Sequence, residues 1–158
     1  MRRARLDPVS DLKKQLRDDL TTAMKARDEL RTATLRMVLT AVSAEEVSGK
    51  EARELSDDEV QAVLRREAKK RREAADAFAG AGRAEQAERE RAEGGVLADY
   101  LPAQLEDADL AAIVADAITR TGAASMKDMG RVMGAANGVV AGRADGGRVA
   151  AEVRRQLG

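Results

Sequence analysis

The sequence predicts an all-α protein, and three observations support this fold class. Charged residues make up 35% of the chain and, together with many alanines, favour helix. Aromatic residues make up only 1%, so the core is expected to contain Leu, Val, Ala and Met, which suit close-packed helices better than a sheet. Apolar residues recur three or four positions apart, and no segment shows the alternation typical of a half-buried strand.

The N-terminal helical domain is expected over residues 11–101. Its apolar spacing predicts helices over 11–26, over 28–47, from just after Ser56 to Phe78, and over 83–92. Ser56 and Glu59 have the spacing of a capping box at the start of the third helix. Gly94 and Gly95 are expected to interrupt the chain after the fourth helix, because glycine is a poor helix former.

A small three-helix tail domain is expected over residues 102–158, after a boundary at Tyr100-Leu101-Pro102. Its first helix is predicted to be capped by Asp107 or Asp109, whose carboxylates can accept free backbone N–H groups. This helix is expected to end at Gly122, because glycine commonly terminates helices.

The two remaining tail helices are short. Ser125 can cap the second, which is expected over 128–137 before Gly138 and Gly142 break the pattern. Asp145 is placed to cap the third. The apolar stripe of this last helix consists of Val149, Val153 and Leu157.

Five motifs in the chain, in this order, resemble those of one family. They are LRMV at 35–38, REAKKRREA at 66–74, YLPAQL at 100–105, DMGRVMGA at 128–135 and GRADG at 142–146. Together they resemble the motifs of the GatB/YqeY family, and the last two resemble its C-terminal signature. The resemblance spans roughly residues 11–157.

The resemblance implies a free-standing YqeY-like protein, rather than the much larger transamidosome subunit that carries this domain as its tail. In that larger relative the similar tail domain contacts the body of tRNA, so the resemblance implies tRNA binding through the C-terminal domain. The family label of carbon–nitrogen ligase activity, with glutamine as amido-N-donor, describes the catalytic domain of the larger relative.

The candidate RNA-binding residues are cations around the Gly-rich connector of the tail. They are Lys127, Arg131, Arg143 and Arg148. A secondary basic patch is formed by Arg65, Lys69 and Arg72, which share one face of the expected third helix. Because aromatic residues are almost absent, RNA contacts are expected to go to the phosphate backbone rather than to stacked bases.

Two features qualify this interpretation. The formal net charge of the whole chain is zero, although residues 119–158 contain seven basic and three acidic residues. The family often has M-P-K-V-K-G where this chain has NGVVAG at 137–142, so two lysines are lost from the connector. An all-helical protein–protein interaction module therefore remains the alternative function.

Four glycines spaced by four residues are expected to be structural. They are Gly130, Gly134, Gly138 and Gly142. The first two are expected to allow close helix packing, and the last two to form chain turns. The alternative is that the loop over 138–142 lies against an RNA backbone, where exposed N–H groups suit phosphate.

Catalysis by the chain itself is not expected. The sequence has no His and no Cys, which excludes His-based acid–base schemes and thiolate nucleophiles and leaves no usual zinc ligands. No Gly-rich loop follows a strand, so no nucleotide cofactor site is expected. The sequence suggests no cofactor, metal or small-molecule substrate.

A cytoplasmic protein that does not associate with membranes is expected. The absence of Cys gives no indication of secretion, and no apolar run approaches the ~18 residues of a membrane helix. Residues 1–10 begin with basic residues, but no hydrophobic region follows, so they do not form a secretory signal. They are expected to be a disordered or frayed N-terminus that Pro8 separates from the first helix.

Overall fold

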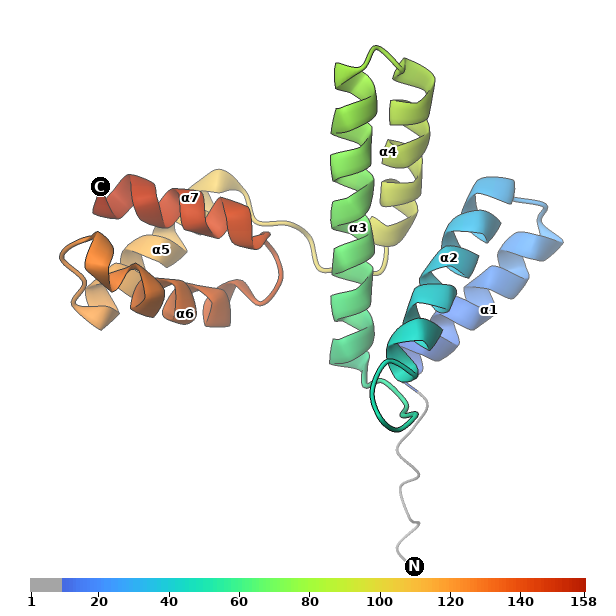
Figure 1. Ribbon diagram of the computed structural model, residues 1–158, viewed down its shortest axis with the longest axis horizontal. Helices are drawn as coiled ribbons and strands as arrows, with labels where there is room; N and C mark the ends of the chain where they lie inside the picture. The colour runs from blue at the N-terminus through green and yellow to red at the C-terminus, as the bar shows by residue number, and fades with distance from the viewer. Residues whose placement is uncertain (1–9) are drawn as a thin grey trace, which may run out of the picture. The chain divides into compact units, whose positions relative to one another are not determined.

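The computed structural model describes residues 10–158, and this part of the chain is all-α (Figure 1). It contains seven α-helices, one 3-10 helix and, within those residues, no strand, so the predicted fold class is confirmed. The chain divides into two compact units. Unit 1 ends at Leu101 and unit 2 comprises Pro102–Gly158.

Unit 1 is built from two antiparallel helix hairpins (Figure 1). Its helices are α1 (Asp11–Lys25), α2 (Glu29–Glu46), α3 (Asp57–Gly80) and α4 (Ala84–Ala98). The α1–α2 and α3–α4 pairs pack along their lengths, and α2 also contacts α3 and α4. All four helices contribute fully buried side chains to one core, among them Leu16, Val38, Leu64 and Leu97. Burying one such side chain contributes roughly 1.5–3 kcal/mol.

Polar side chains cap the first three helices. Ser10 and Asp28 each accept the backbone N–H three residues ahead, and Ser56 with Glu59 forms the predicted capping box. Ser10, which the sequence places in the frayed N-terminus, is instead buried as the N-cap of α1. The rest of that predicted segment, residues 1–9, lies outside the described residues.

The fourth helix is longer than predicted, because α4 continues through Gly94 and Gly95 to Ala98. Val96 and Leu97 follow the glycines and are buried in the core, and their burial outweighs the ~1 kcal/mol that each glycine costs a helix. The predicted interruption at these glycines is therefore wrong.

Unit 2 is a three-helix bundle with its own core. Its elements are α5 (Asp107–Thr121), the 3-10 helix η1 (Met126–Asp128), α6 (Met129–Val140) and α7 (Gly146–Leu157). Each α-helix of this unit contacts the other two. Val114 on α5, Val132 on α6 and Val153 on α7 are fully buried in this second core.

The start of α5 differs from the prediction. Glu106 occupies its N-cap and makes no side-chain capping bond, whereas Asp107 and Asp109 lie within the first turn. Carboxylates in the first turn still stabilise a helix through its macrodipole. Gly122 ends α5 as predicted, in the left-handed region with a φ of 66°.

The end of α6 also differs. The helix extends to Val140, beyond the predicted 128–137, because Val140 is buried in the core of unit 2 and its burial offsets the low helix propensity of Gly138. The predicted turn at Gly138 is therefore wrong. The chain leaves the helix through Ala141 and Gly142, which have φ angles of 49° and 79°.

Candidate nucleic-acid interface

The outer face of α6 carries three glycines and is bare. Gly130, Gly134 and Gly138 are exposed, and a Cβ atom added at any of them would have no neighbour within 4 Å. The close helix packing predicted for the first two is therefore not found within unit 2. We call these three residues the glycine face. Along it, an approaching molecule can come nearer to the helix backbone than side chains would otherwise allow.

Two of the predicted cations border the glycine face. Lys127 lies one turn before Gly130, is exposed, and has no ion-pair or hydrogen-bond partner for its ammonium group among residues 10–158. Arg131 is 61% exposed, and its Nη2 lies 2.6 Å from Asp128 Oδ1. Its Nη1 donates to the carbonyl of Thr121 at 3.2 Å. The backbone N–H of Ala124 and the Arg131 guanidinium hold the pKa of Asp128 below its usual range.

Arg143, by contrast, completes the end of α6. Its Nε donates to the carbonyl of Val140 at 3.0 Å and its Nη2 to the carbonyl of Val139 at 2.8 Å. These carbonyls belong to the last turn of the helix, which has no partner for them within the helix. The guanidinium is therefore already used as a cap, and it is not simply available to a ligand.

Arg148 also has a place within the fold. Its Nη2 donates to the carbonyl of Leu105 at 2.8 Å and to Asp107 Oδ1 at 3.0 Å. The N–H of Leu105 donates in turn to the carbonyl of Arg143 at 2.7 Å. Arg143 and Arg148 thus meet at the backbone of Leu105, where they fix the segment that leads into α5.

The electrostatic balance of unit 2 is neutral, because it contains seven basic and seven acidic residues. Some of its positive side chains form ion pairs within the unit and others do not. Arg120 pairs with Asp116 at 2.5 Å, and Arg155 pairs with Glu152 at 2.6 Å. Hydrogen bonds from Arg155 and Gln156 lower the pKa of Glu152 to about 2. Lys127 and Arg154 are the exposed cations of the unit that make no such pair within residues 10–158, and of the two only Lys127 borders the glycine face.

The secondary basic patch belongs to unit 1. Arg65 is half-buried, whereas Lys69 and Arg72 are exposed on α3. Lys69 Nζ lies 3.9 Å from Glu73 Oε1, a loose pair in water. The structure therefore places these three residues on one helix, as predicted, but in a different unit from the glycine face.

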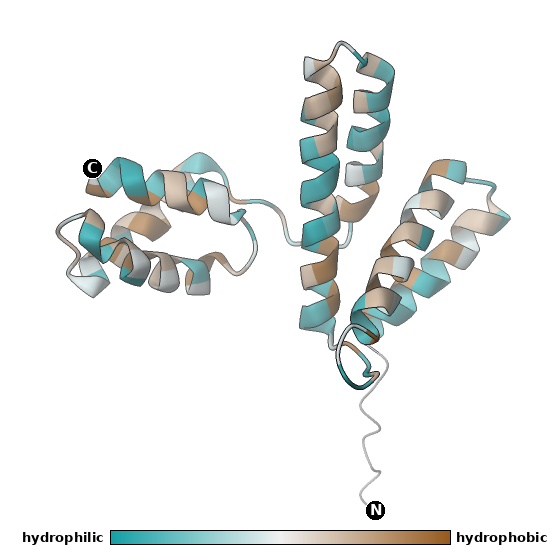
Figure 2. Ribbon diagram, viewed as in Figure 1, coloured by the Kyte–Doolittle hydropathy of each residue, from teal (hydrophilic) through white to brown (hydrophobic). Residues whose placement is uncertain are grey.

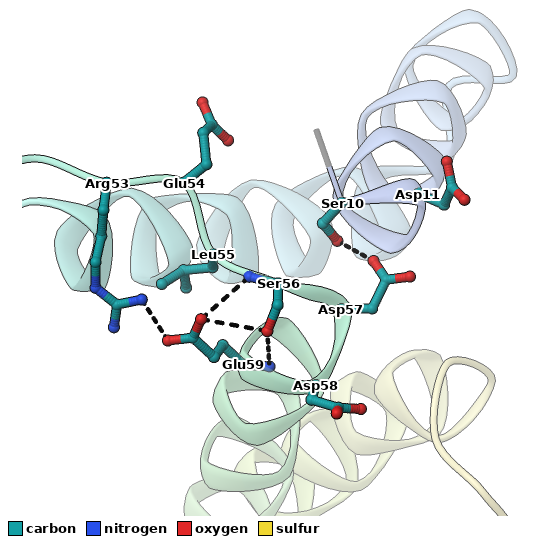
Figure 3. A pocket seen from close by; sticks show the side chains of 9 residues that line it. All are labelled: Ser10, Asp11, Arg53, Glu54, Leu55, Ser56, Asp57, Asp58 and Glu59. Atoms are coloured by element: carbon teal, nitrogen blue, oxygen red, sulfur yellow. Dashed lines mark hydrogen bonds and ion pairs between the residues drawn. The ribbon is translucent and has the colours of Figure 1, made fainter. Parts of the chain in front are cut away.

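An open pocket of about 700 Å³ lies beside the N-terminus of α3 in unit 1 (Figure 3). Three of its five acidic side chains, those of Glu54, Asp57 and Glu59, are already engaged. Asp57 accepts from the hydroxyl of Ser10, and Glu59 accepts from Arg53 and Ser56. No group of three or more metal-ligating side chains occurs among residues 10–158. These contacts hold together the start of α1, the connector before α3 and the first turn of α3. The spacing of apolar residues in the sequence did not predict them.

No helix in the described part of the chain has the length and apolar character needed to cross a bilayer. Comparison with curated proteins found no match. A family model described as "Yqey-like protein" matches residues 13–157, and the chain therefore belongs to the YqeY-like protein family.

Proposed function

We propose that the chain is a non-catalytic, cytoplasmic accessory protein that binds tRNA through the glycine face of unit 2. The observation that carries this proposal is the exposed glycine face of α6 beside Lys127 and Arg131. A phosphate backbone can approach a bare helix closely, and the two cations can then contact its oxygens. The similar tail domain of the larger relative, which contacts the tRNA body, supports the choice of ligand.

This proposal narrows the predicted contact set. Lys127 and Arg131 extend from the exposed face, so they are the primary phosphate contacts. Arg143 and Arg148 act as positioning residues, because their guanidinium groups hold the end of α6 and the segment at Leu105. Non-catalytic action is supported by the lack of His and Cys in the sequence.

A protein-interaction module is the second candidate, and one observation favours it. Unit 2 is neutral, and most of its arginines are paired within the unit. A helix face with glycines four residues apart also fits the backbone of a partner helix at close range. This candidate predicts a partner that stays bound after nuclease treatment of a lysate, whereas the tRNA proposal predicts that tRNA is recovered.

The test is a titration of total tRNA into the full chain at two salt concentrations. Gly134→Leu fills the glycine face without a clash inside unit 2, so it should weaken binding while the helical circular dichroism stays unchanged. Lys127→Ala should reduce the slope of log affinity against log salt by roughly 0.7–0.9. Gly95→Leu is the matched control, because Gly95 is also an exposed helical glycine with open space around it.

Two results would exclude the tRNA proposal. The first is the absence of tRNA binding by the wild type at low salt. The second is equal binding by the wild type, Gly134→Leu and Lys127→Ala. If a nuclease-resistant protein partner were lost specifically in Gly134→Leu, the second candidate would replace the first.

A further inference from the structure

The outer face of α3, in unit 1, carries a line of three cations. Arg65, Lys69 and Arg72 follow one another at intervals of four and three residues, so they lie along one side of the helix. We call them the α3 stripe. The middle turns of α3, where the α3 stripe lies, are hydrophilic, whereas its C-terminal turns are richer in apolar residues (Figure 2).

Three glutamates near the α3 stripe lie in the α3–α4 interface, whereas Glu73 and Asp76 share the exposed side of α3 with the stripe. Arg71 faces α4, where its Nη2 lies 3.2 Å from Glu67 and its Nη1 lies 3.3 Å from Glu90. Glu93 is a further partner of the same guanidinium at 3.6 Å. The three glutamates are therefore largely buried around Arg71 in the α3–α4 interface, and they do not neutralise the outer face at close range.

The outer face carries more cations than carboxylates, with Arg65, Arg66, Lys69 and Arg72 against Glu73 and Asp76. Arg65 has no ion-pair partner within residues 10–158, and the closest carboxylate oxygen to Lys69 is the loosely held Glu73 at 3.9 Å. The neighbouring Arg66 adds a further cation, whose Nη2 lies 3.3 Å from Glu45 at the end of α2. Exposed pairs of this kind are weak, so a polyanion can displace them.

We propose that the α3 stripe is a second binding surface, which contacts the phosphate backbone of double-stranded RNA. An α-helix rises 1.5 Å per residue, so the stripe extends over about 10 Å. One strand of B-DNA carries a phosphate about every 3.4 Å along its axis, and the spacing in an RNA duplex is of the same order, so the stripe can meet two or three phosphates. The chain supplies no aromatic side chain beside the stripe for base stacking, and this favours a duplex over a single strand.

An anionic membrane is a less suitable partner for the same charges. A helix that binds a membrane surface presents an apolar face next to its basic face. The apolar face of α3 is instead buried in the core of unit 1, as Val60, Leu64 and Ala68 show. The choice of RNA as the ligand of the α3 stripe rests on the proposed function. Duplex binding by the stripe does not require that the glycine face binds tRNA.

The experiment uses the full chain and a short fluorescent RNA duplex that lacks the tRNA fold. The triple variant Arg65→Gln/Lys69→Gln/Arg72→Gln should bind the duplex more weakly than wild type. Its slope of log affinity against log salt should be smaller by about 2 to 3, at about 0.9 for each lost phosphate contact. The charge-preserving variant Arg65→Lys/Lys69→Arg/Arg72→Lys should retain the wild-type slope.

The matched control removes three cations from the exposed side of another helix in unit 1. Lys14, Arg17 and Lys25 lie on one side of α1, and all three are exposed. Lys14→Gln/Arg17→Gln/Lys25→Gln has the same net charge as the stripe variant and should leave duplex binding close to wild type. Circular dichroism and thermal unfolding of both triple variants show whether the fold is kept.

Three outcomes would overturn the proposal: no duplex binding by the wild type, equal loss in the stripe and control variants, or stripe-dependent binding to anionic phosphatidylserine vesicles without duplex binding. Gly134→Leu separates this proposal from the proposed function. If Gly134→Leu loses tRNA binding but keeps stripe-dependent duplex binding, both stand. If the stripe is required for duplex binding while Gly134→Leu leaves tRNA binding unchanged, the proposed function is wrong, but the α3 stripe is still supported as a duplex-binding surface.

Discussion

At the scale of single residues, the arginines of unit 2 differ in their hydrogen-bond partners and in their exposure. Arg143 donates to two carbonyls in the last turn of α6, whereas Arg131 stays 61% exposed, pairs with Asp128 and donates one bond to the carbonyl of Thr121 at the end of α5. Hydrogen bonds that satisfy otherwise unpaired backbone groups contribute more to stability than exposed ion pairs do. Arg143 therefore serves mainly to hold the end of α6, whereas Arg131 remains exposed enough to contact a ligand.

Arg143→Ala should therefore destabilise unit 2 by about 0.5–1.5 kcal/mol, because the carbonyl of Val139 loses its donor and that of Val140 keeps only the backbone N–H of residue 143. The measurement is amide hydrogen exchange in α6, which reports the free energy of opening of that helix. Arg154→Ala, at an exposed position of α7, is the control and should change that free energy by less than about 0.5 kcal/mol. Equal protection in both variants would show that the Arg143 cap contributes nothing.

Sequence reasoning identified Arg143 as a cation near a glycine-rich connector, but not as a cap. Its role depends on Ala141 and Gly142, whose left-handed backbone turns the chain back so that the side chain reaches the end of α6. Spacing along the chain did not reveal this role. The predicted helix ended at Asn137, whereas α6 ends at Val140, only three residues before Arg143.

Tyr100 joins the end of unit 1 to the first hairpin. It is 8% exposed, its hydroxyl donates to Asp19 Oδ2 at 2.5 Å, and Arg31 Nη2 donates to the hydroxyl at 3.4 Å. Burial and the hydrogen bond to Asp19 raise the pKa of Tyr100 to about 12. The phenol is therefore held in its protonated form as a donor.

Tyr100→Phe should lower the free energy of unfolding by roughly 1–3 kcal/mol at pH 7, because it removes a hydrogen bond to a charged acceptor. A pKa raised from 10.0 to about 12 stabilises the folded state below pH 10, and this contribution is lost between pH 10 and pH 12. Urea unfolding of both proteins across this range should show the difference shrinking as the pH rises. A constant difference up to pH 12 would contradict the assigned hydrogen bond.

At the scale of elements, a buried lysine joins α1, the end of α2 and the connector into α3. The side chain of Lys13 is 4% exposed, and its ammonium lies 2.8 Å from Glu46 and 3.1 Å from Glu54. Glu46 also accepts the N–H of Leu55 at 3.3 Å. Burial alone raises the pKa of Glu46, but the hydrogen bonds from Lys13 and Leu55 outweigh it and hold the pKa below its usual range.

Lys13→Met should lower the free energy of unfolding by about 3 kcal/mol at pH 7, because Glu46 is left without its buried partner. The lowered pKa of Glu46 stabilises the fold above about pH 4.5, and this contribution is lost as the pH falls. The difference between wild type and variant should therefore narrow below that pH in urea titrations. Lys14→Met, at the adjacent exposed position, is the control and should be close to neutral.

Most helices could be predicted from apolar spacing, whereas several of their ends could not. The starts at Ser56 and Asp145 follow from local capping, which depends only on neighbouring residues. Gly95 and Gly138 lie inside helices because buried residues beyond them, such as Leu97 and Val140, extend the packing. That burial depends on tertiary contacts, which a local pattern of glycines does not reveal.

At the scale of the whole molecule, the two units have separate hydrophobic cores. The core of unit 1 draws on α1 to α4, and that of unit 2 draws on α5 to α7. The family match over residues 13–157 covers nearly all of both units. The glycine face and the α3 stripe therefore lie on different units.

The predicted division into two domains leads to a test with fragments 10–101 and 102–158. Each fragment keeps the complete buried cluster of its unit, so each should be helical by circular dichroism, and their summed spectra should match that of the corresponding full chain. A domain near 60 residues buries only about 60% of the surface that its unfolded chain exposes. Fragment 102–158 should therefore unfold at a lower temperature than fragment 10–101, but still with a cooperative transition. If fragment 102–158 is unfolded alone and becomes helical when fragment 10–101 is added, the two units form one folding unit, and the predicted domain division is wrong.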